Sequence, residues 1–419
     1  MSLLDADLGE GRRWAKVGDG YAVTKKPRSL DRSTFPTIPF AAMEAIPQGG
    51  AYLPDFAMKP GDAIVSGTYF ERGDVLVGKI TPSFENGKQA LIQDLPAPFG
   101  YATTEVIPLH PISDRYDPRF LFFYLLHPDV RHYVAERMEG STGRQRVPEY
   151  VLLDLPIPDL EPDEQKAVAD AIETLHMAIS AETACEERAR DLKRAAMRAL
   201  FTKGLRAEAQ KETEIGPVPE SWATPTVAEA VLPFRFDRRK QVAKSAYGEV
   251  GEWPIIDQGQ QAIAGFTDDA EKIITPAPPI IIFGDHTRAF KFVDFPFALG
   301  ADGTKPLLAR EGIDARFLFQ ALCALDVPSR GYNRHYTALS EMCLPMPSTQ
   351  EEQREIVAIL DAIDRKIDLH RRKRTVLDEL FKALLHRLMT GEIRVSDLDL
   401  SALSSGPVPA TKQTPEVAA

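Results

Sequence analysis

Two short polar stretches contain the side chains best suited to reading the edges of DNA bases. The first, GSTGRQRVPEY, spans residues 140–150, and the second, GYNRHYTALSE, spans residues 331–341. Arg presents a forked donor that pairs with guanine, and Asn or Gln pairs with adenine, when a rigid loop holds them. The candidate DNA contacts are Ser141, Thr142, Arg144, Gln145 and Arg146 in the first stretch, and Tyr332, Asn333, Arg334, His335 and Tyr336 in the second. Each stretch could equally be an ordinary solvated loop.

Further candidates follow two apolar runs that have the pattern of buried strands. DVLVGKITP at 74–82 and PIIIFGDHT at 279–287 each run into a polar turn that contains glycine. The polar residues at these turns are Lys79, Thr81 and Lys88 in one case and His286, Thr287 and Arg288 in the other. Arg238, Arg239 and Lys240 form a basic cluster suited to phosphate groups. Solvated loops remain the simpler interpretation of all these groups.

Several patterns could suggest catalysis, and each fails on inspection. The one Pro-Pro pair, in PAPPI at 276–280, lacks the amide and aromatic neighbours that a DNA-adenine methyltransferase needs. Gly87 and Lys88 do not form a phosphate-binding loop, because Pro82 stands where its first glycine belongs. Asp285 beside His286 resembles a catalytic pair, but we expect a loop residue that caps its own backbone. We therefore predict no catalytic residue and no enzymatic activity in this chain.

Metal and disulfide sites are not indicated either. His127 and His132 are five residues apart, not at the four-residue spacing of a helical ligand pair, so we interpret them as structural. Cys185, Cys323 and Cys343 are far apart and have no spacing typical of zinc or of a disulfide framework. The sequence predicts no metal site and no cofactor bound by this chain.

Length and composition limit the protein class. A chain of 419 residues is too long for one core, so two to three domains are expected. The longest apolar run, FLFFYLL at 120–126, is far too short to cross a bilayer, and the N-terminus lacks an apolar signal core. We therefore expect a cytoplasmic protein. The formal net charge is −11, but residues 151–221 alone contribute −6, so the larger blocks on either side are nearly neutral. DNA binding is thus permitted by composition.

The elements that must position these candidates are organised by a repeat. LPIPDLEPDEQ at 155–165 and LPMPSTQEEQ at 344–353 each open a long helical pattern, and placing Gln165 on Gln353 gives a constant offset of 188 residues. Prolines and acidic residues mark each start, and a glycine follows each end. The spacing predicts helices over 159–204 and 348–392. Apolar and charged residues at heptad positions form a seam in each: Val168, Ile172, Leu175, Ile179, Glu182, Glu186 and Leu200 in the first, and Ile356, Leu360, Ile363, Ile367, His370, Arg374, Leu377, Phe381, Leu384 and Leu388 in the second.

Charges interrupt the middle of both seams with opposite sign. Glu182 and Glu186 occupy the places that His370 and Arg374 occupy in the second copy. If the helices pack antiparallel, the acidic middle of one meets the basic middle of the other, which would determine register and orientation. The alternative is that each charged run is only a solvated face. We predict the antiparallel pair.

The blocks before the helices repeat as well. DPRFLFFYLL at 117–126 corresponds to DARFLFQALC at 314–323, about the same distance before each long helix. The predicted fold is α+β, with two globular domains joined by two long antiparallel coiled-coil helices in a pseudo-twofold internal repeat. The domains are predicted at 1–158 (core about 21–158) and 222–347, with a linker at 205–221 and a disordered tail at 393–419.

This arrangement resembles the specificity subunit of type I restriction–modification enzymes. GSTGRQRV, PIIDQGQQAIAG, FGDHTRAFKFVDFPFALGADGTKPL and TEIGPVPESW are similar to stretches common in that family, and the likeness covers about residues 20–394. Residues 1–20 depart from it, because they lack the opening seen at 217–222. The resemblance implies two target-recognition domains, each reading half of an asymmetric bipartite site in double-stranded DNA. It also implies that the helix pair sets the gap and docks two methyltransferase subunits.

The same resemblance implies further partners. Restriction/translocase subunits would join through the methyltransferase subunits, and S-adenosylmethionine, ATP and Mg would be bound by the partners. One alternative of a different class is a scaffold that does not bind DNA, with two binding modules spaced by a coiled coil. A fragment of a fused methyltransferase–specificity protein is a weaker alternative.

Overall fold

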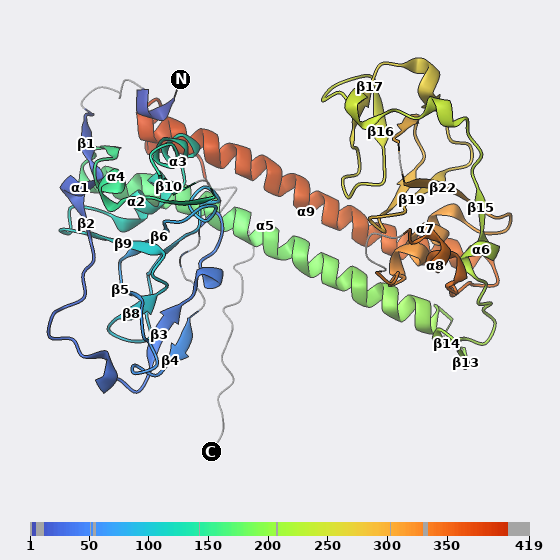
Figure 1. Cartoon of the computed structure of the whole chain (residues 1–419), viewed down its shortest axis with the longest axis horizontal. Coiled ribbons are helices and arrows are strands. Elements are labelled where there is room, and N and C mark those ends of the chain that lie inside the picture. The colour runs from blue at the N-terminus through green and yellow to red at the C-terminus, as the bar shows by residue number, and fades with distance from the viewer. Residues whose placement is uncertain are drawn as a thin grey trace. The chain divides into compact units, whose positions relative to one another are not determined.

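The structure, a computed structural model, divides the chain into two compact units. It describes residues 2–5, 12–50, 52, 56–141, 143–206, 208–301, 303–329 and 334–400. The first unit contains residues 1–183 and 372–419, and the second contains residues 184–371. Two long helices, α5 (Pro162–Lys203) and α9 (Gln350–Thr390), contribute one half to each unit (Figure 1). The predicted domains excluded these helices, whereas each observed unit includes half of both.

The first unit is built on two four-stranded sheets. The order of the first sheet is β2 (Tyr21–Val23), β9 (Val106–Pro111), β6 (Val75–Gly78) and β7 (Gln89–Leu91), and that of the second is β4 (Ala57–Lys59), β3 (Ile38–Ala41), β8 (Gly100–Ala102) and β5 (Thr68–Phe70). β3 and β8 pair in parallel, and every other pair is antiparallel. Leu76 and Ala90 of the first sheet pack with Phe70 and Ala102 of the second in one buried cluster. The two sheets therefore pack face to face.

Helices cover the other side of the first sheet. They are α2 (Pro118–Tyr124), α3 (Pro128–Ala135) and α4 (Glu149–Leu153), and α1 (Val17–Gly20) lies before β2. β1 (Trp14–Lys16) pairs with β12 (Pro156–Pro158), and Val17 is fully buried. The first domain thus begins before the predicted core boundary at Tyr21, because this short antiparallel pair ties the N-terminal segment to the entry of α5.

The second unit repeats the same topology. Its sheets have the orders β15 (Val231–Pro233), β22 (Thr304–Ala309), β19 (Ile280–Gly284), β20 (Phe290–Val293) and β17 (Gly265–Thr267), β16 (Trp253–Ile256), β21 (Phe297–Leu299), β18 (Ile273–Ile274). β16 and β21 form the parallel pair that corresponds to β3 and β8. The accompanying helices are α6 (Val227–Ala230), α7 (Ala315–Ala324) and α8 (Tyr336–Glu341). The predicted internal repeat is confirmed.

Two hairpins complete the described strands. β10 (Glu139–Ser141) pairs with β11 (Arg144–Arg146), and β13 (Gln210–Thr213) pairs with β14 (Gly216–Pro219). The second hairpin lies within the segment predicted as a linker, so much of 205–221 has regular structure. None of the described helices is both long and apolar enough to cross a membrane.

The long helices pack antiparallel in both units. In the first, Val168, Ile172 and Leu175 of α5 share a buried cluster with Leu384 and Leu388 of α9, and Ile179, Leu377 and Phe381 pack at its margin. In the second, Leu200 of α5 shares a cluster with Ile356 and Leu360 of α9. Ile367 is buried and Ile363 is half-buried. The burial follows the predicted seam, because only one stripe of each helix faces its partner.

Ion pairs occupy the middle of the seam, as predicted. Glu186, with only 5% of its side chain exposed, lies 3.6 Å from Arg371, and Glu182 lies 3.5 Å from Lys373. These cations flank the predicted His370 and Arg374, which are both half-buried. Long side chains at positions beside the seam can reach across it, which explains why the neighbours supply these contacts.

Gln165 and Gln353, which occupy the same position in the two repeats, make equivalent hydrogen bonds. Gln165 Oε1 accepts a hydrogen bond from the Asp117 backbone N–H (3.1 Å), and Gln353 Oε1 accepts one from the Asp314 N–H (2.7 Å). Their amide nitrogens donate to Leu160 O (2.8 Å) and to Pro347 O (3.3 Å). Both glutamines are buried. Each one therefore fastens the start of a long helix to the helix α2 or α7 of its own unit.

The predicted disorder of the tail does not hold for its first part. Ile393, Val395, Leu398 and Leu400 pack against the core of the first unit. Four apolar side chains within eight residues provide enough apolar surface to hold this segment against the core. The remainder of the predicted tail, 401–419, lies outside the described residues.

Candidate nucleic-acid interface

In the first unit the structure joins two of the predicted groups. The Thr81 N–H donates to Gln145 O (3.0 Å), and the Val147 N–H donates to Lys79 O (2.8 Å). The residues after β6 therefore lie directly against the β10–β11 hairpin. Gly143 has a φ of +80° at the hairpin turn, a conformation that favours glycine. The hairpin is held at its base by backbone hydrogen bonds and carries its polar tip into solvent.

The side chains of this surface divide into anchors and exposed groups. Arg146 donates to Glu105 through Nε (3.0 Å) and Nη2 (2.9 Å), and this hydrogen bonding lowers the pKa of the Glu105 carboxyl. Lys88 Nζ donates to Met43 O (2.8 Å) and Thr81 Oγ1 to Glu85 (3.0 Å). Among the described residues, these three candidates thus have intramolecular partners.

The remaining candidate residues of the first unit differ in exposure. Ser141 and Arg144 are exposed, Lys79 and Gln145 are half-buried, and Thr142 lies outside the described residues. The Arg144 guanidinium makes no hydrogen bond or ion pair with the described part of the chain. It is therefore an exposed donor that could contact a base or a phosphate group.

In the second unit, Asp285 is the centre of the predicted surface. Its side chain is buried, and Oδ1 accepts hydrogen bonds from the backbone N–H groups of His335 (2.9 Å) and Tyr336 (2.8 Å). The His335 ring also donates through Nδ1 to Asp285 O (2.8 Å). Our expectation that Asp285 caps its own backbone was wrong, because the groups that it caps lie fifty residues further along the chain. It joins the turn after β19 to the start of α8.

The neighbouring candidates again separate by burial. His286 and Arg334 are exposed, whereas His335 is buried and can only position the loop. Thr287 Oγ1 donates to Gln258 O, and the Arg288 guanidinium donates to Val327 O (2.8 Å). Tyr336 is half-buried beneath Lys305, whose Nζ lies 5.8 Å from the ring centroid. Tyr332 and Asn333 lie outside the described residues.

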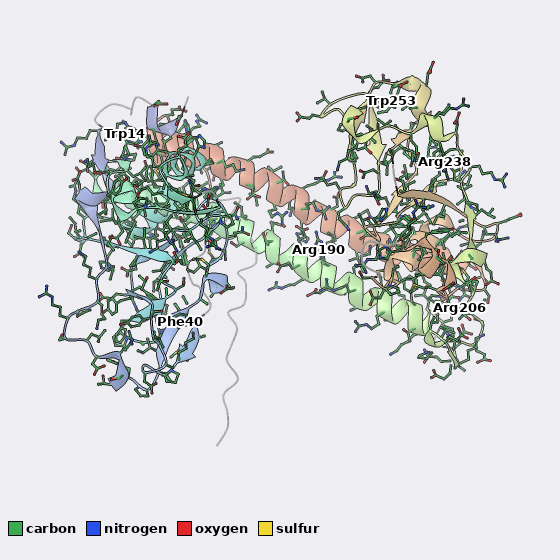
Figure 2. All side chains as sticks on the ribbon, in the orientation of Figure 1. Trp14, Phe40, Arg190, Arg206, Arg238 and Trp253 are labelled. Carbon is green, nitrogen blue, oxygen red and sulfur yellow. The ribbon has the colours of Figure 1, made fainter. Side chains whose placement is uncertain are left out.

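The basic cluster forms a single 3-10 turn. Asp237 caps it by accepting from the Arg239 N–H (3.0 Å), and its carboxylate also pairs with the Arg239 guanidinium (3.0 Å). Arg238 and Lys240 are exposed, and Figure 2 shows Arg238 on the second unit. This turn could bind phosphate, with Arg239 partly neutralised by its neighbour.

Sequence reasoning missed one segment of this surface. The loop after β16, residues 257–263, contacts the turn after β19 through Gln258 and Gln260. Three glutamines within four residues, at 258, 260 and 261, were the available signal. The sequence shows this stretch only as one that resembles the family, because it does not show which strands bring it beside His286.

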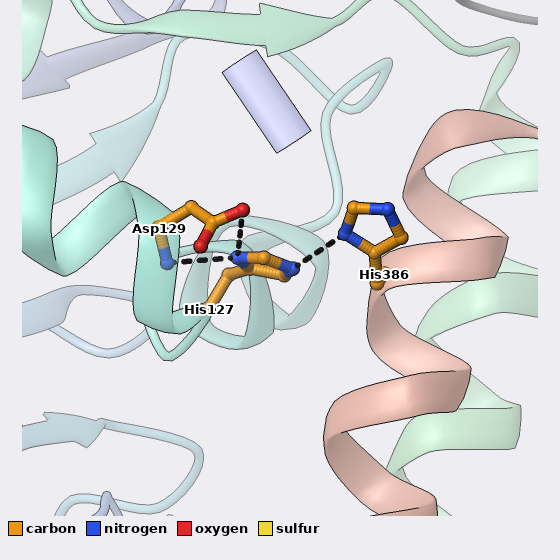
Figure 3. Close-up of side chains that lie close together, drawn as sticks. All are labelled: His127, Asp129 and His386. Atoms are coloured by element: carbon orange, nitrogen blue, oxygen red, sulfur yellow. Dashed lines mark hydrogen bonds and ion pairs between the residues drawn. The ribbon is translucent and has the colours of Figure 1, made fainter. Parts of the chain in front are cut away.

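His127 and His386 form a hydrogen-bonded pair in the first unit (Figure 3). The Asp129 N–H donates to His127 Nδ1 (3.1 Å), so Nδ1 is the acceptor and the ring proton is on Nε2. Nε2 in turn lies 3.3 Å from Nδ1 of His386 on α9 and donates to it. The ring nitrogens of His127 and His386 and the Asp129 carboxylate lie within 4.8 Å of one another, close enough to hold a metal ion. Both His127 nitrogens, however, already have hydrogen-bond partners. His132 is exposed and pairs with Glu136 at 3.2 Å.

This buried histidine predicts a pH-dependent stability. Burial lowers the pKa of His127 to about 4. Asp129 opposes this to a smaller extent by raising the pKa, and His386 and Arg131 lower it further. The unfolded chain takes up this proton near pH 6.5, so stability is unaffected above that pH and falls between pH 6.5 and 4. We expect a loss of about 3 kcal/mol by pH 4 from this group.

The comparison uses two asparagine variants. His127→Asn, which keeps an acceptor for the Asp129 N–H, should remove most of this slope, whereas His132→Asn at the exposed site should keep it. Chemical unfolding of the first unit at stepped pH measures the slope. Equal slopes in wild type and His127→Asn would contradict the prediction.

Known proteins with similar sequences belong to one class. Residues 230–379 match the family described as type I restriction modification DNA specificity domain. The putative type I restriction enzyme MjaX specificity subunit of Methanocaldococcus jannaschii is 24% identical over 341 residues, which cover 77% of this chain and 79% of that protein. The EcoAI specificity subunit of Escherichia coli is 33% identical over 115 residues, 27% of this chain and 20% of that protein.

Solved structures have the same fold. A type I restriction–modification S subunit from M. genitalium gives a TM-score of 0.57 at 15% identity, covering 93% of this chain and 99% of that one. A chain from a structural study of the assembly and conformational transition of a type I system gives 0.52 at 18% identity, covering 92% and 100%.

Proposed function

Because this chain belongs to the family of type I restriction–modification specificity subunits, we propose that it is the sequence-specific DNA-binding subunit of such a complex. It has no catalytic activity of its own and selects the DNA on which partner subunits act. Each unit reads one half of a bipartite site. This role places the protein in the cytoplasm, together with the DNA.

One observation carries this proposal: the same topology occurs twice with different loops. Both units place a turn after a buried strand (β6 or β19) against a second polar segment that precedes the long helix. A repeated module suits a duplex with two half-sites. The first unit exposes Ser141 and Arg144 on this surface, whereas the second exposes His286 and Arg334, so the half-sites should differ. The site should therefore be asymmetric.

The outer faces of the long helices support partner docking. On α9, Ile359, Leu369, Val376 and Leu380 are between 40% and 62% exposed, and on α5 Met177 and Leu192 are 50% and 54% exposed. The α9 residues fall on heptad positions distinct from the seam, which suits a further helix packing against them. We assign these faces to two methyltransferase subunits, which would carry S-adenosylmethionine and recruit restriction/translocase subunits that use ATP and Mg.

A negative charge introduced on the outer face of α9 should weaken docking of the methyltransferase. Leu369→Glu or Val376→Glu places a carboxylate in the proposed contact, and we expect methyltransferase association to weaken about tenfold to a hundredfold because the charge must be desolvated. Lys382→Glu, at an exposed site on the other side of the seam, is the control. Co-purification and titration with the methyltransferase measure the effect, and unchanged association of both variants would contradict it.

The function is tested by mapping methylated adenines in DNA from cells that express this chain with its methyltransferase. We expect one split, asymmetric motif with modified adenine in both halves. Exchange of residues 222–347 for the matching domain of a relative should change one half only. A scaffold without DNA-reading function would give no motif that follows this chain.

Helix length should set the gap. Inserting one turn in each of α5 and α9 adds about 5.4 Å. Because a base pair rises roughly 3.4 Å, the gap in the methylated motif should widen by one to two base pairs, with both half-sites unchanged. An insertion in only one helix breaks the register of the seam and serves as the contrast. An unchanged gap after the double insertion would show that the helices do not set the spacing.

A further inference from the structure

We propose that the loop after β16, residues 257–263, is a base-reading segment of the second unit, and that Gln261 within it reads an adenine. This inference rests on the proposed function and specifies a residue for it. Glutamine pairs with adenine because its amide can donate to N7 and accept from the N6 amino group in the major groove.

The loop is held rigidly. Asp257 Oδ1 accepts from the Gly259 N–H (2.8 Å) and lies 3.4 Å from Nζ of Lys291, whose side chain is only 9% exposed. At the far end, the Ala264 N–H donates to Ile255 O (2.8 Å). The loop is therefore closed on strand β16 at its far end and tied at its start to Lys291 of β20, a strand of the other sheet. A preorganised loop can discriminate bases without first losing conformational entropy.

The loop is also fastened to the predicted reading surface. Gln258 O accepts from Thr287, Gln258 Oε1 accepts from the His286 N–H (3.3 Å), and Gln260 Nε2 donates to Thr287 O (3.3 Å). There is no space between the two segments, since a Cβ built on Gly284 would lie 2.6 Å from Gln258 O. Asp285 ties the same turn to His335 and Tyr336. Three segments distant in sequence thus share one support.

The hydrogen bonds single out one glutamine. Gln258 and Gln260 already use their amides within the protein, and they position the loop. Gln261 is exposed, and its amide has no hydrogen bond with the described part of the chain. Ile263, two residues further along the loop, is 40% exposed and could contact a thymine methyl group. Gln261 is the amide left available for a base.

The experiment uses the complex of this chain with its methyltransferase on a library of randomised half-sites. Gln261→Ala should lower the preference for adenine at one position of the second unit's half-site by about tenfold or more. The other half-site should be unchanged. The salt dependence of binding should also be unchanged, because no phosphate contact is removed. Gln210→Ala, an exposed glutamine of the same unit in β13, should leave the whole motif intact.

Two results would overturn the inference. One is a wild-type motif for Gln261→Ala, and the other is an equal loss of selectivity in both halves. Because Gln261 is exposed, the variant should melt at the wild-type temperature, and Gln261→Asn tests whether a shorter amide restores part of the selectivity. If wild type itself gives no bipartite motif, the proposed function fails; if only Gln261→Ala behaves as wild type, the assignment of Gln261 fails.

Discussion

Replacing Asp285 with alanine should destabilise the start of α8 by about 1 to 3 kcal/mol and weaken recognition of the second unit's half-site. The substitution removes the acceptor of the Tyr336 N–H and leaves the His335 N–H only its longer hydrogen bond to the Asp285 backbone O (3.1 Å). Each unpaired buried donor costs about 1–3 kcal/mol, and hydrogen bonds to a charged acceptor are among the stronger ones. Residues 334–336 would then leave the turn after β19, so Arg334 would lose its position.

Native-state hydrogen exchange of residues 334–341 in the full chain measures the local free energy of opening. Asp285→Asn keeps an oxygen acceptor and should lose much less than alanine does. Asp294→Ala, at an exposed site of the same unit, should have no effect on either exchange or recognition. If Asp285→Ala exchanges as slowly as wild type, Asp285 is not the support that we describe.

Replacing both Gln165 and Gln353 with alanine should have the largest total effect. Each substitution removes the partner of a partly buried N–H, at Asp117 or Asp314, and of a buried carbonyl, at Leu160 or Pro347. We expect about 2–4 kcal/mol per site. The two sites lie in different units, so the effects should add.

The duplicated site provides its own control. Gln165→Ala should accelerate exchange in α2 and leave α7 protected, and Gln353→Ala should do the reverse. Gln350→Ala, at an exposed position in the first turn of α9, should change neither. Acceleration of both α2 and α7 by either single variant would mean that the anchors are not local to their units.

The long helices could be predicted because their pattern is local. A heptad seam, acidic first turns and following glycines specify two paired helices without any knowledge of tertiary contacts, and the buried positions from Val168 to Leu388 follow that seam. The sheet order could not be predicted. The pairs β3–β8 and β16–β21 are parallel and join segments some 40 to 60 residues apart, and no short-range pattern encodes such pairing.

The candidate site was predictable only in outline. Composition and position located the β10–β11 hairpin and the turn after β19, which the structure places at surfaces. The sequence could not show that Arg146 pairs with Glu105 or that His335 is buried, because both depend on neighbours far away in the sequence. The loop at 257–263 was missed for the same reason.

The connection between Arg12 and the end of α9 ties the N-terminal piece of the first unit to its C-terminal piece. Arg12 Nη1 donates to Leu388 O (2.8 Å), and its guanidinium also pairs with Glu164 at the start of α5. The second unit is one uninterrupted segment, 184–371, inserted between the two pieces of the first. Because Leu3 near the start and Leu400 near the end of the described chain both pack in the first unit, a circular permutant opened between 204 and 221 should retain the cores of both units.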